Sequence, residues 1–328
     1  MVEVPERNLA LELARVTETA AMAAARWQGR GNKEAADQAA VDGMRLILNS
    51  LDIDGTIVIG EGEKDNAPML YNGESVGTGR GEAWDVAVDP VDGTTLTAEG
   101  MPGAIAVIAL AERGSMYAPG SLVYMDKIAV GPAAAGRIDL EAPVADNLQA
   151  VAKAQGKDIN DLTAVILNRT RNERYIREVR EAGARIRLIG DGDVAGSISA
   201  ATRGTGVDIL LGIGGSPEAV ISAAAMACLE GEIQCRLWPR DDSERQYAVD
   251  NGHSLEQVLT THDLVSSDRV MFAATGVTGG EFLDGVEYFG NGAVTHSIMM
   301  RSRTGSIREM RSTHNFNKLR QISALILD

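Results

Sequence analysis

Residues 84–95, WDVAVDPVDGTT, end an apolar strand with two carboxylates around a proline. Pro90 has a fixed φ, so the chain turns in one way at this point. Asp89 and Asp92 stand three residues apart across that turn and can approach the same ion. Because Mg²⁺ and Mn²⁺ prefer oxygen ligands, the pair is a candidate ligand set for a hard divalent cation.

The residues that follow Asp92 suit a phosphate. Gly93 permits unusual dihedral angles and a close approach of a ligand to the backbone. The backbone N–H groups of Gly93, Thr94 and Thr95 could form an anion-binding nest, and the Thr94 hydroxyl could orient or activate a water molecule. The alternative is an ordinary acidic turn, because Asp-Pro and Asp-Gly are common turn pairs.

Acids elsewhere in the first half favour the ligand interpretation. The segment GEGEKD, 60–65, ends a second expected strand and carries Glu61 and Glu63 among glycines. Asp37 lies on an expected helix. Taken alone, the segment would be a solvated glycine-rich turn and Asp37 would be a surface charge.

A further acid, Glu218, stands in GIGGSPEAV, 212–220. Pro217 suits the first turn of a helix with Ser216 as its N-cap, so Glu218 is expected at the mouth of a site. Its alternative role is a favourable interaction with the helix dipole. Several acids at strand ends and a helix start predict an oxygen cage for two or more metal ions, and such cages favour phosphoryl transfer to water.

The second half supplies positive charge. The segment NRTRNERYIR, 168–177, carries four arginines after the expected strand TAVIL. Arg169 and Arg171, nearest to the strand end, are the candidates for a distal phosphate, because bidentate guanidinium contacts suit phosphate oxygens. The alternative is a solvated helix face with pairs such as Glu173–Arg177.

The segment GDGDVAG, 190–196, opens a helix after a strand, as a dinucleotide-binding loop does. Its spacing is one residue off the usual glycine fingerprint, and Asp191 and Asp193 would repel a pyrophosphate. Acceptance of hydrogen bonds from sugar hydroxyls is the better role for these two aspartates.

Periodicity indicates the elements that must position these residues. Two amphipathic helices and a run of strands come first, and helices then alternate with strands in the second half, which indicates a layered α/β fold. We expect two closely packed lobes, or one domain, with residues 1–140 as a metal-binding lobe and 141–328 as a substrate-binding lobe. The boundary is expected in the loop between Gly131 and Asp146.

Composition excludes several classes of protein. The net charge is −15 with no basic tract, which argues against nucleic-acid binding. The run AIAVIALA, 104–111, is far shorter than the ~20 residues of a membrane span, and the start does not resemble a signal peptide, so a cytoplasmic protein is expected. Cys228 and Cys235 have no companion pair and are expected to be buried. A phosphate ester would need metal ions and a few Arg or Lys to offset the negative charge.

The motif DPVDGTT after WDVAV resembles the signature of the lithium-sensitive, metal-dependent sugar phosphatases, which include the inositol monophosphatases. The segments RVTETAAMAAARWQGRGNKEAAD, DGTIVIGEGEKDNAPMLYNGE, VYMDKIAVGP, RLIGDGDVAGSI and GIGGSPEAVISAA resemble class II fructose-1,6-bisphosphatase, from about residue 7 to 313. The resemblance implies the sugar-phosphatase fold, an αβαβα five-layer sandwich. It implies hydrolysis of the 1-phosphate of fructose 1,6-bisphosphate to fructose 6-phosphate in gluconeogenesis, and a homo-oligomer, dimer or tetramer.

The resemblance also implies roles for particular residues. Metal ligands, for Mg²⁺ or Mn²⁺, would be Asp37, Glu61, Asp89, Asp92 and Glu218, and Thr94 would polarise the attacking water with Asp37 and Glu61 beside it. Substrate contacts would come from Asp92, Gly93, Thr94, Tyr124, Arg169, Thr170, Arg171, Asp191, Gly192, Asp193 and Gly215, with Lys33 as an extra charge.

This sequence departs from the family pattern in three places. Position 32 is Asn where the family is associated with Asp, and Asp92 stands where some members carry Glu. The stretch after Trp238 is short, where some relatives have an acidic insertion.

Other functions stay open from the sequence alone. A bisphosphatase that also accepts sedoheptulose 1,7-bisphosphate and an inositol-phosphatase-like enzyme are alternatives within the superfamily. A non-catalytic sugar-phosphate sensor and an NAD-dependent oxidoreductase built on GDGDVAG are alternatives from other classes.

Overall fold

The structure is a computed structural model that describes residues 9–62 and 69–322. In these ranges, eight strands form a first sheet in the order β12-β13-β11-β4-β3-β1-β2, and β14 pairs with β13. Only β1 and β3 run parallel; the other pairs are antiparallel. The strands are β1 (Asp54–Ile59), β2 (Ser75–Val76), β3 (Ala83–Asp92), β4 (Ile105–Glu112), β11 (Met271–Gly276), β12 (Glu287–Phe289), β13 (Gly292–Arg301) and β14 (Ser306–Asn315).

The second sheet of the described chain has six strands in the order β10-β9-β5-β8-β6-β7. Here β6 is parallel to both of its neighbours, and the other pairs are antiparallel. The strands are β5 (Tyr124–Val130), β6 (Thr163–Leu167), β7 (Arg185–Ile189), β8 (Ile209–Gly215), β9 (Glu232–Leu237) and β10 (Leu259–Thr260).

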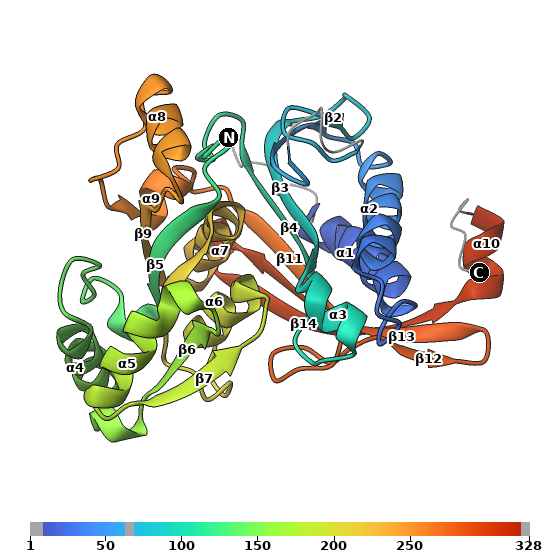
Figure 1. Cartoon of the computed structure of the whole chain (residues 1–328). Coiled ribbons are helices and arrows are strands. Elements are labelled where there is room, and N and C mark those ends of the chain that lie inside the picture. Colours follow the sequence, from blue (N-terminus) through green and yellow to red (C-terminus); the bar gives the residue numbers. More distant parts are fainter. Residues whose placement is uncertain (1–8, 63–68, 323–328) are drawn as a thin grey trace.

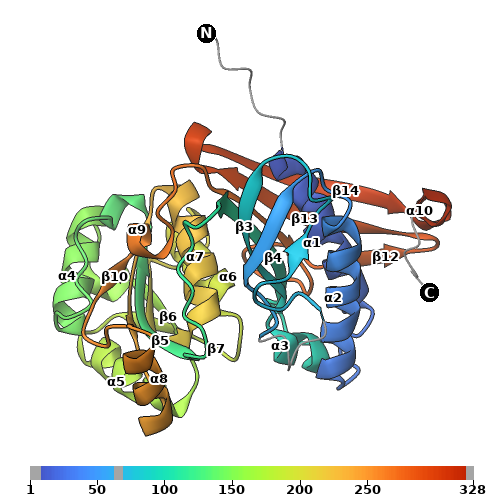
Figure 2. The ribbon, with the colours of Figure 1, turned by 90° about the horizontal axis from the view of Figure 1, so that it is seen from above.

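Helices complete a five-layer arrangement (Figures 1 and 2). One helix pair covers the outer face of the first sheet, a second pair lies between the sheets, and a third covers the outer face of the second sheet. In that order the pairs are α1 (Leu9–Ala25) with α2 (Lys33–Leu48), α6 (Asp193–Ala201) with α7 (Ser216–Leu229), and α4 (Val144–Gln155) with α5 (Glu173–Glu181). The expected αβαβα layering is therefore confirmed.

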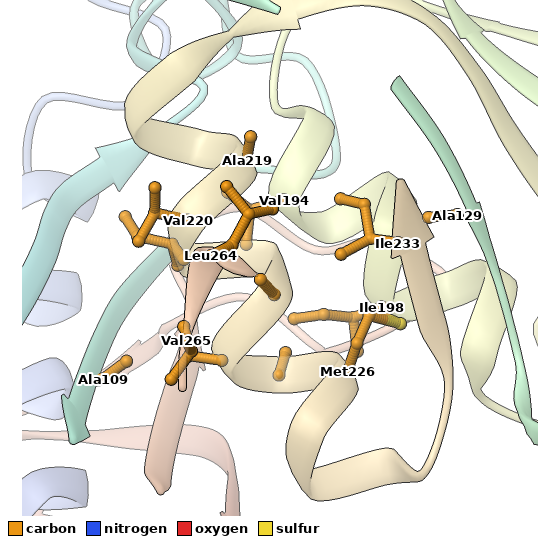
Figure 3. Packing of buried hydrophobic residues seen from close by; sticks show 14 of the residues in the cluster. Ala109, Ala129, Val194, Ile198, Ala219, Val220, Met226, Ile233, Leu264 and Val265 are labelled. Carbon is orange, nitrogen blue, oxygen red and sulfur yellow. The ribbon is translucent and has the colours of Figure 1, made fainter. Parts of the chain in front are cut away.

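The central helix α7 packs against both sheets, and its sequence SPEAVISAAAMACL explains how. Small side chains allow close packing on every side of the helix, and such a helix is apolar all round. Figure 3 shows the core around it, with Val194 and Ile198 of α6, Met226 of α7 and Ile233 of β9. This core places the beginning of α7 between the two sheets.

Several local expectations need correction. The helix at 216–229 begins one residue earlier than predicted, so its N-cap is Gly215 and the Ser216 hydroxyl forms no cap hydrogen bond. A short helix, α3 (Thr94–Glu99), follows Gly93 where only a turn was expected. Two further helices, α8 (Asp242–Asp250) and α9 (Thr261–Leu264), were not predicted from the sequence. The last described helix is α10 (Phe316–Ile322).

The two sheets do not divide the chain at one point. Strand β5, in the first expected lobe, pairs with β8 and β9, whereas β11 pairs with β4 of the first sheet. Sheet membership therefore does not coincide with lobes 1–140 and 141–328, and the division into lobes stays a prediction.

Among the described helices, none has the length and apolar composition that crossing a membrane would require. Cys228 and Cys235 are free and buried, as expected.

Candidate active site

Two adjoining cavities lie where the first and second sheets approach each other around the start of α7. One has a volume of about 410 Å³, and half of its lining residues are acids. The other has a volume of about 550 Å³ and includes two arginines and a tyrosine in its wall. We call them the acidic cavity and the arginine cavity. The residues that line both are Gly60, Asp92, Asp191, Pro217 and Glu218.

The acidic cavity collects the predicted metal-ligand residues from four elements. Asp37 comes from α2, Glu61 follows β1, Asp89 and Asp92 lie near the end of β3, and Glu218 lies in the first turn of α7. Lys33, Gly93 and Thr94 also line this cavity. Glu63 lies outside the described residues.

The end of β3 presents its two aspartates by a local irregularity. Pairing with β4 shifts register between Asp89 and Asp92, and the backbone N–H of Val91 donates to Asp89 Oδ1 over 3.0 Å. Gly93 then takes a φ of +103°, in the left-handed region that disfavours other residues. This conformation turns the chain directly into α3, so Thr94 begins a helix beside the two aspartates.

Crowded, buried carboxylates dominate the electrostatics of the acidic cavity. Burial raises the pKa of Glu61 to about 8, and the charge and hydrogen bond of Asp37 add to the shift. Burial also raises the pKa of Asp37, and it raises the pKa of Asp89 and Asp92 well above the ordinary value. For Asp89 the next largest cause is the charge of Asp92.

The donor set of the acidic cavity fits a hard divalent cation. Glu218 Oε2 is buried and has no hydrogen-bond partner, so this oxygen can bind a ligand. Clustered carboxylates that burial keeps from ionising are stabilised as anions by a nearby cation. Within residues 9–62 and 69–322, however, no three His, Cys, Asp or Glu side chains are arranged to hold one ion as they stand.

The arginine cavity is built around Tyr124, the first residue of β5. The Arg171 guanidinium lies 4.2 Å from the centre of the Tyr124 ring, and its Nε donates to the carbonyl of Ile213 over 3.0 Å. Trp238 packs edge-on against the same tyrosine, with ring centres 6.2 Å apart. The contacts of Arg171 with Tyr124 and Ile213 fix its guanidinium in one orientation at the wall of the cavity.

The segment 190–193 links the two cavities. Asp191 Oδ2 accepts a hydrogen bond from the Thr95 amide over 3.2 Å, and Asp191 Oδ1 lies 3.9 Å from the Arg169 guanidinium. Asp92 Oδ2 accepts from the Ala195 amide of α6 over 3.2 Å. The Asp92 carboxylate thus occupies one backbone N–H, that of Ala195, which a dinucleotide-binding loop would offer to a pyrophosphate, and this argues against that alternative. One amide of the expected nest, that of Thr95, is likewise bonded to protein.

All but one of the predicted site residues line the two cavities. The exception is Thr170, which is exposed and begins the 3₁₀ turn Thr170–Asn172. Asn32, the departure from the family pattern, caps α2: its Oδ1 accepts from the Ala35 amide over 3.0 Å. Lys33 Nζ donates to Thr95 Oγ1 over 2.8 Å, which ties α2 to α3.

Sequence reasoning missed two parts of the site. The loop 119–123 lines the arginine cavity, and its only signal was a Pro-Gly pair before β5. Lys127, fully buried behind the cavity, bonds to Asp193. Its signal was a charged residue in the middle of an apolar strand.

Comparisons with known proteins identify the family of this chain. Residues 7–314 match the profile of the family described as bacterial fructose-1,6-bisphosphatase, glpX-encoded. The chain is 46% identical over 326 residues to fructose-1,6-bisphosphatase 1 class 2 of Escherichia coli strain K12, with 95% of this chain and 96% of that protein covered. The class 2 enzymes of Escherichia coli O6:H1 and Shigella flexneri match equally well. The chain therefore belongs to the class 2 bacterial fructose-1,6-bisphosphatases, which are metal-dependent phosphoric monoester hydrolases.

Proposed function

We propose that this chain hydrolyses the 1-phosphate of fructose 1,6-bisphosphate, giving fructose 6-phosphate and phosphate. The observation that carries the proposal is the common wall of the two cavities, formed by Asp92, Asp191 and Glu218 among others. A sugar with a phosphate at each end can place its 1-phosphate in the acidic cavity and its 6-phosphate in the arginine cavity. A monophosphate would use only one of them.

We propose that Asp37 and Glu61 hold one Mg²⁺ or Mn²⁺ ion and that Asp89, Asp92 and Glu218 hold the others. Bound there, divalent ions supply neutralisation of the phosphate, orientation of a water and stabilisation of the leaving oxygen. The buried, partnerless Glu218 Oε2 and the raised carboxylate pKa values support this assignment.

Thr94 is the proposed water-orienting residue. Its place as the first residue of α3 fixes its backbone, and its hydroxyl can accept a hydrogen bond from a water and pass a proton to a carboxylate of the cavity. Lys33 supports this arrangement, because its bond to Thr95 holds α2 beside α3.

The arginine cavity is the proposed site of the sugar and the distal phosphate. Arg169 and Arg171 would bind the 6-phosphate, and Tyr124 would donate a hydrogen bond to the substrate. Asp191 and Asp193 would accept hydrogen bonds from sugar hydroxyls. Gly192 and Gly215 line the same cavity without side chains, which leaves room for the sugar.

The test is phosphate release by metal-stripped protein with Mg²⁺ or Mn²⁺ added back. Fructose 1,6-bisphosphate should release one phosphate in a metal-dependent reaction, whereas inositol 1-phosphate should release little. A parallel reaction with sedoheptulose 1,7-bisphosphate decides whether the sugar length matters. No release from any bisphosphate with either metal would overturn the proposal in favour of a sugar-phosphate sensor.

A homo-oligomer in the cytoplasm stays a prediction from the family resemblance. Light scattering of the purified chain measures the oligomeric state directly.

A further inference from the structure

Lys127 is a fully buried cation inside an apolar core. It lies in the middle of β5, flanked along the strand by Met125 and Ala129, which share its face of the sheet and belong to the core between the two sheets. Its register partner on β9 is the buried Cys235. An apolar side chain would be expected at this position of a central strand.

The Lys127 ammonium is bonded to one acid of the site, Asp193. Its Nζ donates to Asp193 Oδ2 over 2.7 Å, and the side chains are 0% and 6% exposed. Burial lowers the pKa of Lys127, but the charges of Asp193 and Glu218 raise it, and the outcome lies above the ordinary value. The lysine is therefore charged at neutral pH.

Gly214 shows that the ion pair has a dedicated space. A Cβ at this position would overlap Asp193 Oδ2 and lie 3.0 Å from Lys127 Cε. Any larger residue at 214 would push the two partners apart. The space between β5, β8 and the start of α6 is thus filled by the ion pair itself.

A buried ion pair of this kind is weak evidence for stability, because desolvation offsets the attraction between the charges. An apolar residue of similar volume would fill the same space without that cost. The position of the pair suggests a functional reason instead. Asp193, the residue that pairs with Lys127, lines the arginine cavity, where the sugar is proposed to bind.

We propose that Lys127 is a positioning residue for substrate binding. It fixes the Asp193 carboxylate at the wall of the arginine cavity. Lys127 itself does not line either cavity, so it acts through Asp193. The inference rests on the proposed role of Asp193 in binding the sugar.

The test is a double-mutant cycle with Lys127→Met, Asp193→Asn and the double variant, each near the volume of the original side chain. Each single variant should raise the KM for fructose 1,6-bisphosphate by about tenfold or more, as is typical when a supporting partner is lost. The double variant should be no worse than Asp193→Asn alone, because both changes remove the same interaction. Calorimetry should show weaker binding of fructose 6-phosphate, while the metal concentration for half-maximal activity stays unchanged.

Lys157→Met is the matched control. Lys157 pairs with the buried Asp208, far along the chain and outside both cavities, so this variant should lose stability without a change in KM. If Lys127→Met likewise loses stability but keeps the wild-type KM, the lysine is structural and the proposal is wrong.

Two further outcomes would also overturn it. One is a double variant whose increase in KM equals the product of the two single increases, which would mean that Lys127 acts independently of Asp193. The other is a shifted metal requirement, which would mean that it acts through Glu218. If Lys127→Met does not fold, the charge-balanced double variant still tests the proposal, since a KM that differs from that of Asp193→Asn would overturn it. Failure of wild-type hydrolysis would instead count against the proposed function.

Discussion

The acidic cavity and the arginine cavity share a wall but differ in how their charges are accommodated. In the arginine cavity each cation has partners: Arg171 bonds to Ile213 and lies over Tyr124, and Arg169 lies near Asp191. In the acidic cavity, several carboxyl groups are buried close together, and their pKa values rise as a result. The arginines of one cavity already have protein partners, whereas a bound cation would stabilise the ionised carboxylates of the other.

This difference indicates where the fold sacrifices stability for function. Buried like charges destabilise the folded state unless they are protonated or neutralised. Residues retained at such positions are expected to serve a ligand, and their removal should stabilise the metal-free protein. The following predictions test this contrast, from the largest expected effect to the smallest.

Asp89→Asn should have the largest effect on activity. Loss of a metal-ligand carboxylate is expected to cost several kcal/mol of transition-state stabilisation, more than about a thousandfold in kcat/KM. The same change should raise the melting temperature of the metal-free protein, because an amide is neutral without binding a proton, whereas the buried Asp89 carboxyl beside Asp92 must be protonated to be neutral. Phosphate release and thermal unfolding measure the two effects.

Asp85→Asn is the control on the same strand. Asp85 is also buried, but its Oδ2 accepts hydrogen bonds from the amides of Ser115 and Met116. Its replacement should lower the free energy of unfolding by about 1–3 kcal/mol, and with it the melting temperature, and should leave kcat nearly unchanged. Equal signs of the two melting shifts would contradict the contrast between strained and satisfied carboxylates.

Thr94→Ala should lower kcat by about 10²–10⁴-fold with little change in KM, because general-base assistance acts in the transition state. Thr94→Ser keeps the hydroxyl and should retain most of the activity. Steady-state kinetics at saturating metal separates the two parameters. Wild-type turnover of the alanine variant would remove Thr94 from the proposed mechanism.

Arg171→Ala should act on the distal phosphate alone. A charged hydrogen bond contributes about 1.5–3 kcal/mol, so the KM for fructose 1,6-bisphosphate should rise about 10- to 100-fold. Hydrolysis of fructose 1-phosphate, which lacks the distal group, should change little. Arg177→Ala on the exposed face of α5 is the control and should leave both substrates unaffected. An equal increase in KM for the two substrates would mean that Arg171 does not bind the second phosphate.

Site residues that lie close together in the sequence could be predicted from it. Short motifs such as DPVDGTT and NRTRNERYIR carry their chemistry within a few residues, so Asp89, Asp92 and the arginines were accessible from spacing and residue type. Periodicity predicted a layered α/β fold, and the order of the five layers came from the family resemblance. Contacts between distant segments were not accessible, because no local pattern encodes a partner far along the chain.

Lys127 and β5 illustrate that gap. The pairing of Lys127 with Asp193 spans 66 positions, and sequence alone gave only an unexplained charge in an apolar strand. The pairing of β5 with β8 and β9 was likewise invisible from the order of elements, which placed β5 with the first lobe. The start of α7 was one residue off because Pro217 fits either of the first two helical positions.

The smallest predicted effect is the pH dependence of metal binding. Burial and Asp37 raise the pKa of Glu61 from 4.5 to about 8, so at neutral pH the metal-free protein holds a proton that a ligating carboxylate must lose. Affinity for Mg²⁺ or Mn²⁺ should rise with pH, by at most about tenfold per pH unit for each proton released, and level off above the pKa of Glu61. Calorimetry in two buffers with different ionisation enthalpies counts the protons.

The sign for folding is the opposite. Between pH 4.5 and about 8 the folded metal-free protein binds more protons at Glu61 than the unfolded chain does, so its stability should fall as pH rises through this window. Saturating metal should abolish that fall, because it stabilises the ionised form. Glu61→Gln should flatten the profile of the metal-free protein. Stability that rises over the same window would mean that Glu61 is already ionised without metal, and the acidic cavity would then be as well satisfied as the arginine cavity.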